Sequence, residues 1–425
     1  MTGTTPSDQT EHSTDETTSE TGTTGERRSA TRPAMDRDRV SRRALLGTGA
    51  LAATALAGCL GTGTDDAEND SGNNTSNADN GTSNADNGTG NGTPEGRGRP
   101  VVQDPPDAVY TPTHQAPVEM VGMVEAGEYT LMPHFSLPHR FWLVRGDGIE
   151  AVPPKIDDSI HLMVAFWDGD TGSLVPVDIG AQVTIRQGGE TVTRVAPWAM
   201  ISQQMGFHLG DNVALPGDGT YTAEITIPSL GSGQVRKTGA FAGRFEETQT
   251  ATVEFEYSTE MSQQLASNVT YTEESRWGEP GAIEPMSGMG SMPAPSLAPA
   301  SEYPGQPVLT PDGETPTSGD ARFVVRYLPA SRLADGGGYL LVSPRTPYNR
   351  IPLPEMALSL AGGRDGDLTQ TLDGTLGLHY GTALSLAPGE TFEIAVESPP
   401  QLARHQGYET AFFEMDTMTV QVPDQ

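Results

Sequence analysis

The chain has 425 residues, a formal net charge of −31 and one cysteine, and these values exclude several classes of protein. The negative charge excludes the basic surface that nucleic-acid binding needs, so we expect no nucleic-acid partner. A single cysteine excludes a disulfide within the chain. Lys155 and Lys237 are the only lysines, and such an acidic, lysine-poor composition is typical of halophilic archaea, whose proteins stay soluble in high salt.

Residues 1–59 have the pattern of an export signal. Arg42 and Arg43 precede a short apolar run, too short to span a bilayer, that ends in Leu-Ala-Gly-Cys at Cys59. This order resembles a twin-arginine signal with the lipobox of exported lipoproteins. We therefore expect lipid on Cys59 and anchoring at the outer face of the cytoplasmic membrane. The alternative is a cleaved signal that carries Cys59 away.

Residues 60–113 are predicted to form a disordered spacer. They are rich in Gly, Asn, Asp, Ser and Thr, and one heptapeptide occurs twice, beginning at Ser76 and at Ser83. Such a polar segment cannot bury enough apolar surface to fold, and it would lift the next domain off the membrane.

The first predicted domain, residues 114–272, contains runs in which apolar and polar side chains alternate, as they do in the strands of a half-buried sheet. The clearest strand is 158–168. Within it, His161 and Met163 are two residues apart and therefore point to the same face. A second alternating run is 220–227.

Two further strands are expected between residues 117 and 144, a segment that contains His134 and His139. We interpret His139, beside an arginine and two aromatic residues, as a packing residue at the end of a strand. For His134 the same interpretation is favoured less strongly over metal binding.

Two thioethers and an imidazole lie just before the strand 220–227. Met200, Met205 and His208 are predicted to share a glycine-broken loop there. Histidine and methionine suit a soft or borderline transition metal better than Ca or Mg, which prefer oxygen. The alternative is a buried Met pair beside a hydrogen-bonded histidine, because Met commonly fills cores.

A second copy of the pattern follows. In both copies a Gly, an apolar residue, a His, an apolar residue and a Gly precede a turn and an alternating strand, with His208 in the first copy and His379 in the second. We predict two tandem copies of one domain. The second occupies residues 320–425, after a linker of Pro, Gly and Met residues at 273–319.

Motifs in both copies resemble the periplasmic high-affinity ferrous-iron transport proteins. In the first copy these are Ile-His-Leu at His161 and Gly-Phe-His-Leu-Gly-Asp-Asn at His208; in the second, His-Tyr-Gly at His379 and Arg-His at His405. The resemblance covers most of the first copy and, more weakly, the second. It implies immunoglobulin-like β-sandwiches, exported and working with an iron permease, that hold copper and carry iron.

The resemblance also implies a metal site in the first copy. The family's first-strand His, its Met and its loop His have counterparts here, and a Met replaces its acidic residue. In that order the four positions are His161, Met200, His208 and Met163. Met205 competes with Met200, which lies one residue further from the loop His than in the family. The family's last His falls on Lys237, which cannot bind a metal while protonated.

The second copy has an incomplete set of these ligands. It keeps His379 and His405, but it has Tyr339 and two leucines in place of the first His, and no Met ahead of the loop. We favour metal binding by the first copy alone, with the second as a degenerate packing partner in an intramolecular pseudo-dimer. The other account, in which His405 completes a shared site, stays open.

The sequence thus predicts an exported, lipid-anchored protein that binds copper or ferrous iron and supports ferrous-iron uptake, with an iron permease as its partner. No nucleophile, acid pair or cofactor loop stands out in the sequence, so we expect no enzymatic activity. The alternative is a cell-surface β-sandwich interaction module without a metal site, in which the His and Met side chains are core.

Overall fold

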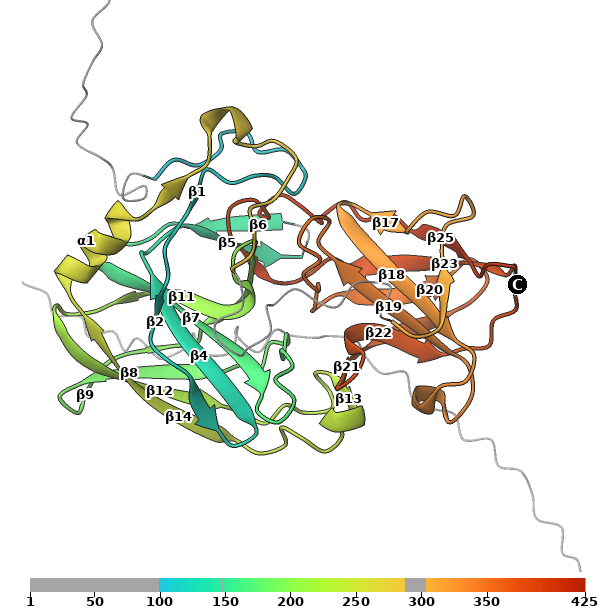
Figure 1. Ribbon diagram of the computed structural model, residues 1–425, viewed down its shortest axis with the longest axis horizontal. Helices are drawn as coiled ribbons and strands as arrows, with labels where there is room; N and C mark the ends of the chain where they lie inside the picture. The colour runs from blue at the N-terminus through green and yellow to red at the C-terminus, as the bar shows by residue number, and fades with distance from the viewer. Residues whose placement is uncertain (1–98, 147, 287–302, 425) are drawn as a thin grey trace, which may run out of the picture. The chain divides into compact units, whose positions relative to one another are not determined.

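The computed structural model describes residues 99–146, 148–286 and 303–424 (Figure 1). Nearly every regular element in this part of the chain is a strand, which confirms the all-β prediction, and its one α-helix is α1 (Thr259–Ser267). None of its helices has the length and hydropathy needed to cross a bilayer. The predicted export signal, Cys59 and residues 60–98 of the spacer lie outside the described residues.

Two sheets pack face to face in the first copy. One has nine strands in the order β2-β4-β7-β11-β10-β24-β5-β6, with β3 also on β4, and the other has four in the order β14-β12-β8-β9. The first sheet consists of β2 (Glu119–Met120), β3 (Val124–Ala126), β4 (Tyr129–Ser136), β5 (Phe141–Arg145), β6 (Gly148–Val152), β7 (Asp158–Asp168), β10 (Trp198–Ser202), β11 (Gly206–Ala214) and β24 (Ala403–Arg404). The second consists of β8 (Gln182–Gln187), β9 (Glu190–Val195), β12 (Gly219–Ile227) and β14 (Gln249–Tyr257), and a separate pair joins β1 (His114–Gln115) to β15 (Thr270–Tyr271).

The period-two pattern of the sequence decides which side chains face the core between these sheets. On β7, Ile160 and Leu162 point into the core, together with Tyr221 from β12 of the facing sheet. The residues that follow each of them on β7, His161 and Met163, are also buried but lie on the opposite face of the nine-stranded sheet. The sandwich therefore leaves this outer face, and its His and Met side chains, to be covered by other parts of the chain.

Residues 320–425, the predicted second copy, supply most strands of a ten-stranded sheet, in which β18, β19, β22 and β21 are consecutive neighbours (Figure 1). Its core joins the same apolar cluster as that of the first copy. The strands are β13 (Arg236–Thr238), β16 (Gln306–Val308), β17 (Thr317–Ser318), β18 (Ala321–Leu328), β19 (Tyr339–Arg345), β20 (Ala357–Ala361), β21 (Gly366–Asp373), β22 (Gly377–Ala383), β23 (Thr391–Ser398) and β25 (Met418–Gln421). Short 3-10 turns are η2 (Gly239–Phe241), η3 (Glu274–Arg276) and η5 (Arg332–Ala334).

Each copy contributes one short strand to the sheet of the other. β24, from the second copy, pairs in parallel with β10 of the first, with Ala403 level with Met200. β13, from the first copy, pairs in parallel with β21 of the second, with Arg236 level with Thr371. This reciprocal exchange brings the segment that follows β24 onto the outer face of the nine-stranded sheet.

The described chain departs from the predicted boundaries at two points. Tyr110, inside the range assigned to the spacer, is fully buried, and β16 begins inside the range assigned to the linker. Pro-rich and Gly-rich composition identifies coil, but coil can still be buried when its backbone groups are paired. Tyr110 N donates to Gly407 O at 3.2 Å, and Thr111 N donates to Glu279 O at 2.9 Å.

Candidate metal centre

The predicted ligands Met200 and His208 lie on a hairpin and not on the predicted glycine-broken loop, so that local prediction is wrong. Met200 is on β10, directly opposite His208 on β11. The sequence folds this way because Ile201 and Phe207, on either side of the turn, both point into the core. The hairpin holds the thioether and the imidazole side by side on the outer face of the sheet.

Gly210 on β11 leaves a gap in which two ligand atoms meet. A Cβ built on this glycine would lie 3.1 Å from His161 Nε2 and 3.1 Å from Met200 Sδ. His161 and Met200 are both fully buried. The missing side chain of Gly210 therefore lets the imidazole of β7 and the thioether of β10 approach the same point.

Met163 and Met205, the other predicted sulfur donors, lie around this point. Met163 is paired with Gly210 across β7 and β11 and is buried. Met205 occupies the turn between β10 and β11 and lines a neighbouring cavity. The contact across Gly210 favours Met200 over Met205 as the partner of His161.

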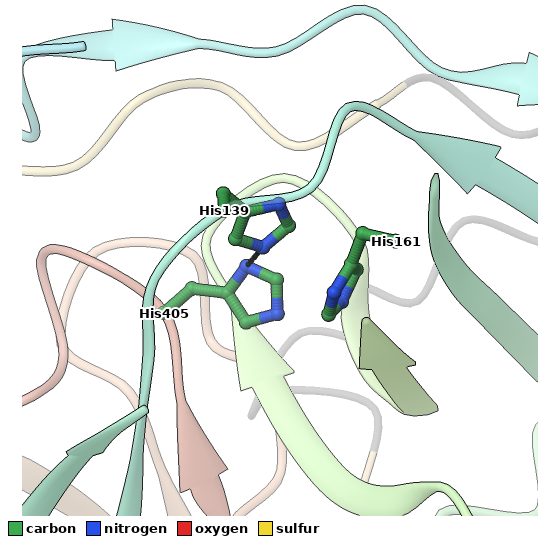
Figure 2. Close-up of side chains that lie close together, drawn as sticks. All are labelled: His139, His161 and His405. Carbon is green, nitrogen blue, oxygen red and sulfur yellow. Dashed lines mark hydrogen bonds between the residues drawn. The ribbon is translucent and has the colours of Figure 1, made fainter. Parts of the chain in front are cut away.

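Two histidines that the prediction leaves out of the metal site complete the cluster. The ligand atoms of His139, His161 and His405 all lie within 4.8 Å of one another. Figure 2 shows the three rings gathered together, with a hydrogen bond between His139 and His405. The ring centre of His405 is 5.4 Å from that of His161 and 5.1 Å from that of His208. His405 comes from the second copy and reaches the first because β24 pairs with β10.

The chain around His405 is fixed by a buried guanidinium. Arg404 donates hydrogen bonds to the carbonyl oxygens of Tyr408, Ala411 and Pro400, and it lies over the ring of Phe413 at 4.3 Å. Burial lowers its pKa to about 9. His405 N in turn donates to Ile201 O at 3.1 Å. These bonds hold the His405 ring against the outer face of the sheet.

One pattern of hydrogen bonds recurs at His161, His208 and His405. The Nδ1 atom of His161 is 2.9 Å from Asn212 Oδ1, and that of His208 is 3.1 Å from Gly206 O. Both partners are acceptors, so each Nδ1 carries the proton. The Nδ1 of His405 lies 3.1 Å from His139 Nε2. All three Nε2 atoms are buried and have no hydrogen-bond partner in the described structure.

His139 has a different place in this pattern. Its Nδ1 lies 3.0 Å from Leu137 O and is protonated, so its Nε2 is an acceptor for the proton on His405 Nδ1. Histidine ligands of metals usually donate their second N–H to such an acceptor, which fixes the ring and its tautomer. The hydrogen bonds therefore give His139 the role of orienting His405.

Burial keeps these imidazoles neutral. It lowers the pKa of His161 and of His405 well below the usual value, and the neighbouring His139 lowers both further. Burial also lowers the pKa of His208 to about 4 and that of His139 to about 3. Neutral imidazole is the form that binds a metal, so the cluster is ready for a cation at pH 7.

A cavity of about 310 Å³ adjoins the cluster. His139, His405 and Met163 lie in its wall, together with Met205 and Arg140. The cavity therefore borders the cluster at His139 and His405, with two thioether side chains beside them.

Lys237, where the resemblance places the fourth ligand of the first copy, lies elsewhere. Its Nζ donates to Leu230 O at 2.9 Å and to Arg244 O. The register sets Lys237 level with Leu372, as Arg404 is level with Ile201. Lys237 is thus the counterpart of Arg404, and the position of His405 falls one residue later, on Thr238.

The second copy has a different arrangement at the equivalent point. His379 Nδ1 lies 3.1 Å from Gly377 O, as in His208, but its Nε2 lies 3.1 Å from the hydroxyl oxygen of Tyr339. Tyr339 occupies the position on β19 that His161 occupies on β7, because each is paired with the residue two after the glycine. A protein hydroxyl therefore satisfies the nitrogen that is open in the first copy.

Comparisons with known proteins give limited matches. Residues 301–421 match the model of a domain of unknown function, DUF7350. No curated protein matches the chain. Two crystal structures of FetP from uropathogenic Escherichia coli strain F11 are similar to it, one as isolated (20% identity) and one a copper-bound variant (19% identity). Each match has a TM-score of 0.27 and covers 33% of this chain and 97% of the FetP chain. The assignment of the site rests on its own side chains.

Proposed function

We propose that this chain is an exported metal-binding protein that holds copper or ferrous iron where its two copies meet and supports ferrous-iron uptake. The observation that carries the proposal is the set of three buried Nε2 atoms, each without a hydrogen-bond partner in the described structure, beside a buried thioether. Leaving a buried polar atom unpaired costs about 1–3 kcal/mol. A cation bound by these atoms removes that cost.

The ligands in this proposal are His161, Met200, His208 and His405. Neutral imidazoles and a thioether are soft or borderline donors that suit copper and ferrous iron. The thioether favours the lower oxidation state of either metal. Met163, paired with Gly210, remains beside the metal as a second sulfur donor.

This ligand set replaces the account in which the first copy binds metal alone. His405 lies against the outer face of the first copy, with its Nε2 buried and its Nδ1 fixed by His139. The second copy, although incomplete as a site, then supplies one ligand and its orienting environment. We therefore propose a site shared by the two copies in place of a site formed by the first copy alone.

The remaining parts of the proposal follow the sequence. Lipid on Cys59 would hold the protein at the outer face of the cytoplasmic membrane, and a permease would receive the metal. The chain would act as a carrier without enzymatic activity. Replacing Cys59 with Ser should release the protein from cell membranes into the medium, which fractionation can measure.

The ligand set is tested by calorimetric titration of Cu(II), and of Fe(II) without oxygen, into the full chain in high salt. We expect one tight site, and we expect His405→Gln to weaken it by about 100-fold or more because a ligand is lost. His379→Gln is the matched control, since His379 is equally buried but bonded to Tyr339. Equal loss in both variants would contradict the shared site. Absence of binding in the unmodified chain would instead favour a surface interaction module.

The transport role is tested in the native host. Cells that carry His405→Gln should grow more slowly than the parent strain when iron is scarce and equally well when iron is abundant. Equal growth of the variant and the parent strain under both conditions would contradict the role in iron uptake and leave only metal binding.

A further inference from the structure

A row of sulfur and nitrogen side chains runs across the first sheet from its edge to the metal centre. Met120 on the edge strand β2 is paired with His134 on β4. His134 is paired with Met163 on β7, and Met163 is paired with Gly210 on β11. The row therefore ends at the glycine beside which His161 Nε2 and Met200 Sδ meet.

The members of this row lie on one face of the sheet and next to one another. Directly paired residues of antiparallel strands share a face, with their Cβ atoms about 4.5–5.5 Å apart. At that spacing, an ion bound to one Met or His side chain would pass to the neighbouring side chain without movement of the backbone. The face is the same outer face on which the metal centre lies.

Exposure falls steeply along the row. Met120 is 50% exposed and its neighbour Met123 is 55% exposed, whereas Met163 is 2% exposed and His134 is fully buried. Packing accounts for buried methionines, which are common core residues. It does not account for the exposed thioether of Met120 on the edge strand, or for a second exposed thioether three residues later in the chain.

His134 can serve as the middle member of the row. Burial lowers its pKa to about 4, and a hydrogen bond with the backbone of Met132 partly offsets that effect. The register of the sheet sets His134 between Met120 on one side and Met163 on the other, which places an imidazole between the two thioethers.

We propose that Met120, Met123, His134 and Met163 form a relay that conducts Cu(I) from the protein surface to the metal centre. The inference rests on the proposed function. At each step one Cu–S or Cu–N bond forms as another breaks, and the copper remains Cu(I), so no oxidant or reductant is needed. Thioethers bind Cu(I) well and Cu(II) poorly, so the relay is selective for the reduced ion.

The relay is tested by the rate at which the full chain takes Cu(I) from its coloured complex with bicinchoninate, measured by stopped flow without oxygen. The double variant Met120→Leu, Met123→Leu removes both surface sulfur atoms and keeps the side-chain volume. We expect Cu(I) uptake to slow by about tenfold, with the equilibrium affinity unchanged, because the centre itself is intact. The rate of Cu(II) uptake should not change.

Met415→Leu in the second copy is the matched control, since Met415 is a partly buried methionine far along the sequence from the row. Its Cu(I) uptake should equal that of the unmodified chain. Equal Cu(I) rates in the double variant and the control would overturn the relay and leave the metal centre standing. If the unmodified chain binds no copper at equilibrium, the proposed function fails first.

Discussion

Gly210 and Gly381 occupy the same position in the two copies, but different groups face them. At Gly210 the gap left by the glycine is bordered by His161 Nε2 and Met200 Sδ, each 3.1 Å from where a Cβ would lie. At Gly381 the hydroxyl of Tyr339 fills the equivalent gap. The same strand hairpin therefore presents open donor atoms in one copy and a closed hydrogen bond in the other.

The remaining positions of the two sites differ in the same way. Thr371 is paired with His379 as Met200 is paired with His208, and its hydroxyl donates to Thr369 O at 3.0 Å. Thr238, the counterpart of His405, donates to the buried carboxylate of Asp373 at 2.6 Å. At these equivalent positions, the polar side chains bond to other groups of the protein.

The comparison indicates what would separate the proposed metal site from a stable core. Burial of His379 and of His208 is equal, and both have the same Nδ1 bond to a carbonyl two residues earlier. The difference is whether Nε2 is paired by the protein or left for an ion. In the second copy the hydroxyl of Tyr339, at the first-strand position, pairs that Nε2, and Thr371 and Thr238 stand at the positions of Met200 and His405.

The largest expected difference between the copies concerns the two glycines. A Cβ on Gly381 would lie 2.6 Å from the backbone oxygen of Leu340 and closer still to the Tyr339 hydroxyl. Because backbone cannot move aside, we expect Gly381→Ala to lower the free energy of unfolding by about 3 kcal/mol. Chemical denaturation in high salt measures this value.

Gly210→Ala is the paired experiment. Its Cβ meets two side-chain atoms and the Leu162 carbonyl at 3.1 Å, a contact that shifts of a few tenths of an ångström relieve. We expect a fold loss below about 1 kcal/mol, with copper affinity reduced at least about tenfold because His161 and Met200 are displaced. Equal destabilisation by the two substitutions, with unchanged copper affinity, would contradict the comparison.

A smaller effect is expected from pH. Burial lowers the pKa of His379 to about 4, whereas an unfolded histidine titrates near 6.5. Below pH 6.5 the unfolded chain gains a proton that the folded chain does not, so stability falls as pH falls. For this residue the loss between pH 7 and pH 5 is about 2 kcal/mol.

His379→Gln should therefore make the pH dependence of unfolding shallower by that amount in the metal-free protein, measured by denaturation at pH 7, 6 and 5. Gln keeps a polar group within reach of Tyr339 but does not titrate. An unchanged pH slope would mean that His379 titrates alike in the folded and unfolded chains.

The sequence predicts the proposed ligands that belong to one copy, and it leaves open those that depend on contact between copies. His161 and His208 follow from strand alternation and the resemblance. His405 is recognised as a histidine without a complete site, but its docking depends on β24 pairing with β10, about 200 residues apart in the chain. No local pattern encodes that pairing. The available signal was that the incomplete ligand sets complement each other. The first copy lacks the family's last His, which the second has as His405, and the second lacks the first-strand His and the Met.

His139 shows a second limit of sequence reasoning. Its neighbours predict a packing residue at a strand end, and its side chain is indeed held by Leu137 O. Its role toward His405 depends on a bond between two copies, at 3.1 Å. The position of Lys237 also depends on pairing between the copies. The register of β13 on β21 makes Lys237, and not Arg236, the counterpart of Arg404.

The smallest predicted effect concerns Asn212, which has Ala383 as its counterpart in the second copy. Asn212 Oδ1 accepts the proton of His161 Nδ1 at 2.9 Å, and its Nδ2 donates to His139 O at 2.9 Å. It thereby aims His161 Nε2 at the gap beside Gly210. Removing such an orienting partner typically weakens metal binding by about 10-fold to 100-fold.

We expect Asn212→Ala to weaken copper binding by about tenfold, or about 1.4 kcal/mol, at the lower end of that range because His161 stays packed between strands. Asn212→Asp keeps the acceptor oxygen and should restore the affinity, which a purely structural role would not predict. Asn349→Ala, which removes an amide bonded to Gln203 O and Ile283 O, is the control and should leave the affinity unchanged. If both alanine variants bind copper as the unmodified chain does, His161 is oriented by its strand alone, and the first copy differs from the second only in the ligands themselves.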